Sequence, residues 1–502
     1  MHLISATIRR FWNSPTLTTW LSYFARALGL LLVTPIILTR FTPAEVTVWY
    51  SLLTLIALQM MADFGFSSTF ARTLAYAMAG LENLHDIRQS QRTSLGNREP
   101  NWSLLRRILS TMSVIYTRLS FGILFFLGIA GTALLWRPIS ETSNPLDAWA
   151  AWGFVLLTIC ITFWGNYLVA FLQGVDRIAV LRRAEAIWTT AGLVSSAIVA
   201  ASGGGIFATI AVYQTFAACN VLWNLRVARG LFDGRLKNLP HILDHEIFES
   251  VWPQAWRSGL GVLMSSGVVQ ATGLIYAQLG PAVEVASYLL AIRFITAIVQ
   301  FTQAPFQSML PSMAREYARN NFAAVMAIAN RGMRRSYFVF TCGVIGVGVT
   351  VGPVLHLMQT RTPFVEPSLW AVMAFAFFLE RWGAMNMQLY SLSNHIIWHI
   401  ANGITGSLYI VLCLATVESL GIWAFPLSMI VANLACYTSY SLYMAYRLFH
   451  LPPLRQELSS GALLTAVLLL VFCMVSSAVE SSQPLRLLVH QNQIEKVTSP
   501  EL

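Results

Sequence analysis

Long apolar runs separated by short polar segments recur along almost the whole chain. One of them, WLSYFARALGLLLVTPIIL, extends from Trp20 to Leu38. About 20 such residues in a helix that rises about 1.5 Å per residue cross the roughly 30 Å hydrocarbon core of a membrane. The pattern therefore predicts an all-α polytopic membrane protein.

We expect about 13 membrane-spanning helices. Totals of 12 or 14 spans are alternatives, because one inner loop, QLYSLSNHII, has no Lys or Arg. The expected spans are residues 18–38, 46–66, 110–135, 148–172, 184–201, 205–224, 254–279, 285–309, 336–357, 367–388, 398–416, 420–445 and 461–479.

Composition agrees with this pattern. Of the 502 residues, 56% are hydrophobic and only 11% are charged, whereas a soluble globular domain has about 25% charged residues. All six cysteines lie in apolar runs, which argues against an extracellular disulfide framework. No apolar core followed by a cleavage site is present near the N-terminus, so we expect the first span itself to direct insertion.

The basic residues lie mostly in the loops on one side of the predicted membrane. Only Arg40, Arg137 and Arg361 fall in the opposite set of loops. Cytoplasmic loops are enriched in Lys and Arg, so the N-terminus is expected in the cytoplasm. The net charge of +10 is thus explained by topology, and we expect no nucleic-acid partner.

Two segments separated by 238 residues indicate an internal repeat. We therefore expect two six-helix lobes around a central cavity, as in alternating-access transporters. The predicted organisation is an N-terminal lobe at 1–225, a cytoplasmic linker at 226–252, a C-terminal lobe at 253–447, and an additional span with a polar tail at 448–502. The matching residues are Pro43, Ala44, Tyr50 and Leu52 with Pro281, Ala282, Tyr288 and Leu290.

Several chemistries lack the residues they require. The only lysines are Lys237 and Lys496, and neither lies in a P-loop. No cluster of His, Cys, Asp and Glu has metal-ligand spacing, so we expect no metal and no cofactor. The polar connections are too short for a catalytic domain, and enzymatic function is not expected.

Ionisable residues inside the spans are the strongest functional signal. Each costs about 2.5–3.5 kcal/mol at the bilayer centre, so such residues usually face an interior or a watery cavity. Five cations against one anion predict a positive cavity whose ligand is an anion such as phosphate, which arginine binds through two parallel hydrogen bonds. These residues are Arg26, Arg118, Arg257, Arg293, Glu380 and Arg381, with Asp63 at the inner end of the second span.

Other interpretations stay open for some of these charges. Arg118 and Arg257 are near predicted helix ends, from which long side chains reach the headgroups. Glu380 and Arg381 are adjacent and do not face each other on a helix. We expect Asp63, Glu380 and Arg381 to serve either ion coupling or structure.

The segment from Leu28 to Ala77 resembles the opening of bacterial polysaccharide flippases of the multidrug, oligosaccharidyl-lipid and polysaccharide exporter superfamily. A second segment resembles the family's second half, with one departure. Gln270, Ala271 and Thr272 stand where many members have an acidic residue, which argues against ion coupling at that position. The shared motifs are Leu38–Arg40, Tyr50–Leu53, Asp63–Ser68, Arg72–Ala75, Leu279–Pro281, Tyr288 and Pro311–Arg315.

The resemblance implies a flippase that moves a polyprenyl-pyrophosphate-linked oligosaccharide across the bacterial cytoplasmic (inner) membrane for O-antigen (lipopolysaccharide) or exopolysaccharide assembly. Arg26 and Arg293, with Arg257 and Arg118, would bind the pyrophosphate. Further expected partners are membrane lipids, a coupling ion (proton or sodium), and a glycan polymerase or assembly protein. The alternatives are a multidrug antiporter of the same superfamily, a membrane-embedded glycosyltransferase or polymerase, and a lipid scramblase or scaffold.

Overall fold

Helices make up every regular element of the described chain. The computed structural model describes residues 28–78, 99–234, 241–393 and 397–478, together with residues 18, 21–22, 24–25 and 80. No strand occurs in these ranges. The prediction of an all-α protein is confirmed.

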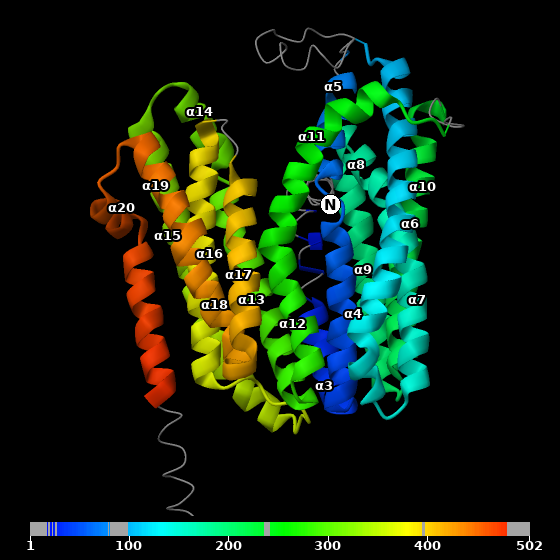
Figure 1. Cartoon of the computed structure of the whole chain (residues 1–502). Helices are drawn as coiled ribbons and strands as arrows, with labels where there is room; N and C mark the ends of the chain where they lie inside the picture. The colour runs from blue at the N-terminus through cyan, green and yellow to red at the C-terminus, as the bar shows by residue number, and fades with distance from the viewer. Residues whose placement is uncertain are drawn as a thin grey trace, which may run out of the picture. The chain divides into compact units, whose positions relative to one another are not determined.

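The chain divides into two compact units, Met1–Ala286 and Ser287–Leu502 (Figure 1). In the first unit α6 packs against α4 and α7, and α10 packs against α7 and α9. The helices of this unit are η1 (Gly29–Val33), α3 (Thr34–Arg40), α4 (Pro43–Met61), α5 (Phe66–Met78), α6 (Trp102–Ser140), α7 (Pro145–Trp164), α8 (Asn166–Gly174), α9 (Ile178–Ala201), α10 (Ile206–Gly230), η4 (Leu231–Gly234), α11 (His245–Val262), η5 (Leu263–Gly267) and α12 (Val268–Leu279).

The second unit begins within α13 (Ala282–Gln307). Its α16 packs against α15, α18 and α19. The remaining helices of this unit are α14 (Leu310–Ala318), α15 (Phe322–Leu357), α16 (Pro367–Tyr390), η6 (Ser391–Ser393), α17 (Trp398–Leu420), η7 (Gly421–Trp423), α18 (Ala424–Ala432), η8 (Asn433–Tyr437), α19 (Thr438–Phe449) and α20 (Pro453–Ser460), followed by a helix at Ala462–Ala478.

Side-chain caps fix the starts of several helices. At α4, the Thr42 hydroxyl accepts from the Glu45 N–H at 3.3 Å, and the Glu45 carboxylate accepts from the Thr42 N–H at 2.8 Å. This capping box satisfies two N–H groups that the helix leaves without partners, and Pro43 follows in the first turn. Asn101, Asn144 and Asp244 cap α6, α7 and α11.

Eight helices of the described ranges are long and apolar enough to cross a membrane, or nine if the bent pair 453–460 and 462–478 forms one span. One of the eight, 398–449, has 52 residues. At about 1.5 Å per residue it is too long for one crossing. Because α17 packs against α18 and η8, the segment folds back on itself and provides two crossings.

The expected spans from 46–66 to 461–479 each overlap described helices, but the helices at 46–66 and 367–388 are not among the eight candidate spans. The first expected span, 18–38, lies partly outside the described residues. Large apolar side chains on these helices are exposed, among them Phe125 at 72% and Phe126 at 66%, as a lipid-facing surface requires. These features show a multi-pass membrane protein.

The predicted boundary between the lobes differs from the division into compact units. Helix α11 begins within the expected linker and α12 follows it, and both pack against helices of the first unit, α11 against α5 and α6 and α12 against α4 and α6. The lobes 1–225 and 253–447, the linker 226–252 and the additional segment 448–502 stay predictions.

Candidate functional site

Asp63 lies at a break between α4 and α5. The backbone turns there through Phe64 at φ 49° and Gly65 at φ 71°. One carboxylate oxygen of Asp63 accepts from the Ser67 N–H at 3.0 Å, and the other accepts from the Ser67 hydroxyl at 2.8 Å. The Tyr116 hydroxyl of α6 also donates to this second oxygen. Asp63 therefore holds the start of α5 against α6, a geometry that fits its structural interpretation.

The α4–α5 break packs closely on α11. A Cβ atom added at Gly259 would lie 2.6 Å from the Cα atom of Phe64, so only glycine fits at this crossing. A Cβ atom at Gly65 would lie 2.7 Å from Cβ of Ser258. The turn is thus fixed by close backbone approach from one side and by the Asp63 hydrogen bonds from the other.

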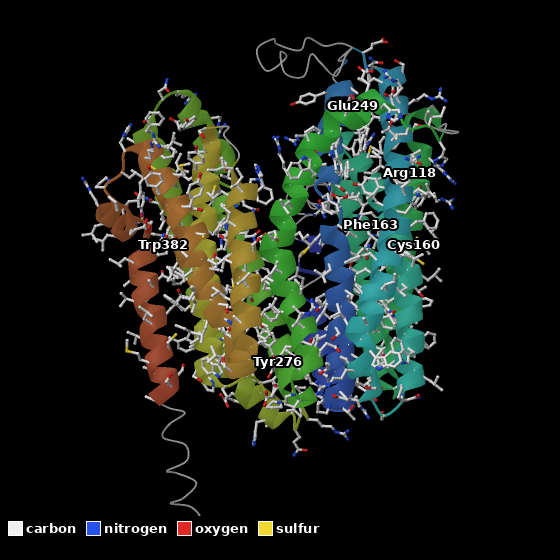
Figure 2. All side chains as sticks on the ribbon, viewed as in Figure 1. Arg118, Cys160, Phe163, Glu249, Tyr276 and Trp382 are labelled. Atoms are coloured by element: carbon white, nitrogen blue, oxygen red, sulfur yellow. The ribbon has the colours of Figure 1, made fainter. Side chains whose placement is uncertain are left out.

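Arg118 and Arg257 both lie on the surface of the first unit. Arg118 is an exposed residue of α6 (Figure 2). Arg257 is an exposed residue of α11, and its guanidinium carbon lies 5.9 Å from the ring centroid of Trp256. Exposure of both side chains favours the interpretation that they extend toward lipid headgroups. Arg26, the first residue we expected at the site, lies outside the described residues.

In the second unit, Arg293 is a half-buried residue of α13, and Glu380 and Arg381 lie on α16. Arg381 is only 2% exposed, and its Nε and Nη2 atoms have no acceptor among the described residues. Glu380 forms no hydrogen bond or ion pair with a described residue. A buried guanidinium such as that of Arg381 destabilises the folded state unless it has a partner for its charge.

Two tyrosines from neighbouring helices lie near these charges, Tyr337 near Glu457 and Arg381, and Tyr437 near Glu380 and Arg381. Tyr337 of α15 is 2% exposed, and its hydroxyl has no partner among the described residues. Tyr437 of η8 packs against α16, where a Cβ atom added at Gly383 would lie 2.9 Å from its ring. The buried environment of Arg381 therefore holds two tyrosine hydroxyls together with the carboxylates of Glu380 and Glu457.

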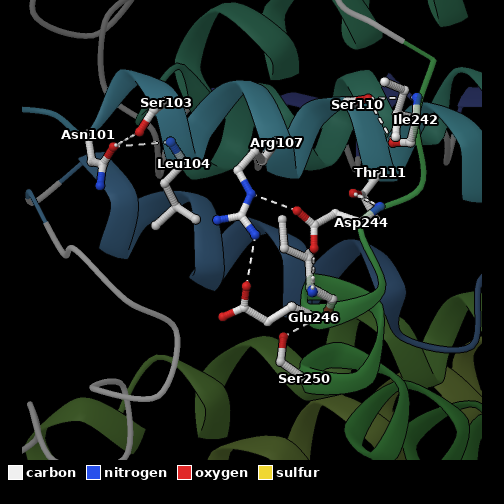
Figure 3. A network of polar contacts seen from close by, with 11 residues as sticks. Asn101, Ser103, Leu104, Arg107, Ser110, Thr111, Ile242, Asp244, Glu246 and Ser250 are labelled. Carbon is white, nitrogen blue, oxygen red and sulfur yellow. Dashed lines mark hydrogen bonds and ion pairs between the residues drawn. The ribbon is translucent and has the colours of Figure 1, made fainter.

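A polar network joins α6 to the start of α11 (Figure 3). The Nε and Nη2 atoms of Arg107 bind the carboxylates of Asp244 at 2.6 Å and Glu246 at 2.8 Å. Ser110 both donates to the Ile242 carbonyl at 2.8 Å and accepts from its N–H at 3.0 Å. The hydrogen bond from Arg107 lowers the pKa of the Asp244 carboxyl below its ordinary value. The segment before α11 is thus fastened to α6.

Sequence reasoning missed Tyr116, Tyr337, Tyr437 and Arg107. The three tyrosines lie within predicted spans. Their only signal in the sequence is the hydroxyl group, because a buried tyrosine usually places its hydroxyl in a hydrogen bond. Their partners come from other helices and are not visible in local spacing. In the described part of the chain no group of three or more His, Cys, Asp or Glu is arranged to hold a metal ion.

Comparisons with known proteins find similarity to solved structures and not to sequences. No family model matches the sequence, and no curated protein matches it. The lipid II flippase MurJ in an inward closed conformation matches with a TM-score of 0.57 at 12% identity, covering 94% of this chain and 100% of that one.

Multidrug transporters match to a similar extent. An inward-facing multidrug resistance MATE family transporter of the MOP superfamily has a TM-score of 0.60 at 12% identity, covering 84% of this chain and 98% of that one. The MATE multidrug transporter DinF-BH has a TM-score of 0.56 at 16% identity, covering 88% of this chain and 97% of that one. This chain therefore has the fold of the MurJ flippase and of the MATE transporters of the MOP superfamily.

Proposed function

We propose that this protein is a flippase that moves a polyprenyl-pyrophosphate-linked oligosaccharide across the bacterial cytoplasmic membrane, for O-antigen or exopolysaccharide assembly. The observation that carries the proposal is the excess of arginine over acid within the spans of a MOP-type fold. Arg381 is buried without an acceptor in the described chain, and Arg293 is half-buried. A pyrophosphate supplies the anionic oxygens that such arginines bind.

In this proposal Arg26 and Arg293 bind the pyrophosphate. Arg118 and Arg257, whose side chains are exposed, make a smaller contribution near the headgroups. The oligosaccharide moves from the inner to the outer leaflet by alternating access. We also propose that transport is coupled to protons or sodium through Glu380 or Asp63. A glycan polymerase would act together with the protein.

The test is glycan export in a strain that lacks its own flippase. Arg26→Ala and Arg293→Ala should each reduce export at least tenfold at normal protein level. Arg361→Ala is the matched control, because Arg361 is exposed in a loop outside the predicted spans. Export by both site variants at the wild-type level would contradict the assignment of these arginines.

A multidrug antiporter is the second candidate, favoured by the structural match to MATE multidrug transporters, DinF-BH among them. Cationic drugs need acidic residues in their cavity, and this chain has one acidic residue among the six charges well inside its predicted spans. Resistance to cationic dyes conferred by expression of the chain, without restored glycan export, would select this function instead.

A further inference from the structure

A groove of about 530 Å³ opens along one end of α10. Its lining combines aromatic, aliphatic and basic side chains. They are Trp188 of α9 and Cys219, Leu222, Trp223, Leu225, Arg226 and Arg229 of α10.

The register of α10 places the basic and apolar residues of the groove side by side. Leu222, Arg226 and Arg229 are spaced four and three residues apart, which puts them along one face of the helix. Trp188 closes the groove from α9, where its ring packs against Phe216 with centroids 6.0 Å apart. The groove is thus a feature of the packed α9–α10 pair.

The two arginines of the groove are not neutralised by the described chain. Arg226 and Arg229 are exposed and form no hydrogen bond or ion pair with any described residue. Arg182, near the start of α9, differs in this respect: its Nη1 atom binds the Glu185 carboxylate at 2.7 Å. The groove therefore has room and positive charge for an anionic ligand.

The position of the groove indicates the kind of anion. Arg226 and Arg229 are near the C-terminal end of a candidate membrane span, on the side that carries most of the basic loops. Leu222 is 60% exposed and Trp223 is 45% exposed, so the groove continues onto an apolar surface of α10. Tryptophans occur at membrane interfaces, and basic pockets between helices on the cytoplasmic side bind anionic headgroups.

We propose that this groove binds an anionic phospholipid of the cytoplasmic leaflet. Arg226 and Arg229 bind its phosphate, Trp188 and Trp223 flank the glycerol region, and Leu222 contacts an acyl chain. A phospholipid fits better than a soluble phosphate because the basic end and the exposed apolar surface are continuous.

The experiment is retention of phosphatidylglycerol by the full-length protein in detergent, measured by native mass spectrometry. Wild type should retain this lipid and not phosphatidylcholine. Arg226→Gln combined with Arg229→Gln should lower retention at least fivefold. The matched control is Arg106→Gln combined with Arg177→Gln, which removes two exposed arginines at the starts of α6 and α9 and should leave retention unchanged.

Two results would overturn the proposal. Equal lipid retention by the groove variant and wild type would show that Arg226 and Arg229 do not bind the lipid. An equal loss of retention in both double variants would show a general effect of charge. Because the glutamine pair also removes cations that stabilise a helix end, Arg226→Lys with Arg229→Lys is measured beside it and should keep most of the binding. Lipid retention is independent of glycan export, so it can fail without affecting the proposed transport.

Discussion

Arg381 is the residue whose buried environment is hardest to explain by packing alone. Arg381→Met keeps most of the aliphatic part of the side chain and removes the buried charge. Desolvation penalises a buried charge that lacks hydrogen-bond partners, so replacing it with an apolar side chain should be neutral or stabilising. We therefore expect thermal unfolding in detergent at an unchanged or higher temperature, together with reduced glycan export.

Arg361→Met, at an exposed position, is the control and should change neither quantity. A clear loss of stability on Arg381→Met would instead show that the arginine holds the second unit together through an acceptor. That result would remove Arg381 from the functional site.

The hydroxyl of Tyr116 is expected to stabilise the first unit. Tyr116→Phe removes the bond to the Asp63 carboxylate and should lower the free energy of unfolding by about 1.5–3 kcal/mol, as for hydrogen bonds to charged groups. Tyr337→Phe is the control, because the Tyr337 hydroxyl is buried without a partner among the described residues. Equal effects of the two substitutions in chemical denaturation would contradict the role given to Tyr116.

Between elements, the crossing of α11 over the α4–α5 break depends on Gly259. Gly259→Ala would place a Cβ atom 2.6 Å from the Cα atom of Phe64, and the neighbouring backbone must move. Such overpacking costs about 1–3 kcal/mol. Gly128→Ala in α6, where no atom lies within 4 Å, is the matched control and should leave the thermal midpoint unchanged or higher.

The fastening of α11 to α6 is expected to depend on pH and salt. Because the pKa of Asp244 is lowered by Arg107, the contribution of this bond is complete above the unfolded pKa of about 3.9 and is lost as the pH falls through the lower folded value. The side chains are partly exposed, so the coupling should be only about 0.2–1 kcal/mol and should weaken in high salt.

A double-mutant cycle of Arg107→Gln and Asp244→Asn measures this coupling at pH 7 and at pH 3. We expect a favourable coupling energy at pH 7 that is smaller at pH 3. A coupling energy that does not change between the two values would show that the ion pair is not what joins these elements.

Hydrophobic pattern alone located the helices well, because a membrane span must bury all of its backbone hydrogen bonds within one apolar segment. It placed their ends poorly. The helices α6 and α15 begin at Trp102 and Phe322, well before the expected spans at 110 and 336. Their first turns are polar enough to extend into water, where hydropathy no longer marks a helix, and capping by Asn101 and Asn321 decides the start.

The candidate site was less accessible to sequence reasoning than the fold. Pattern and charge identified Asp63 and Arg381 as unusual, since an ionisable residue within an apolar run is visible in the sequence itself. The residues around them, Tyr116 from α6 and Tyr337 from α15, come from other helices. Their relation to the charges depends on helix packing, which local periodicity does not encode.

For the whole molecule, the fold is similar to that of the MurJ flippase and of MATE transporters, and the two proposed substrates are to be distinguished. A flippase for anionic lipid-linked glycans should use the arginines of its spans, whereas a multidrug antiporter should depend on acids. Expression of the wild-type chain discriminates between them. We expect it to restore glycan export and to leave resistance to cationic dyes at the level of cells without the protein.

The most direct measurement follows a polyprenyl-pyrophosphate-linked oligosaccharide in vesicles reconstituted with the purified protein. The glycan is loaded in one leaflet, and its appearance in the other is detected with a lectin or glycosidase that does not cross the membrane. We predict protein-dependent translocation that Arg26→Ala and Arg293→Ala reduce at least tenfold and Arg361→Ala does not. Translocation no faster than in protein-free vesicles, under an imposed proton or sodium gradient as well as without one, would contradict the proposed function.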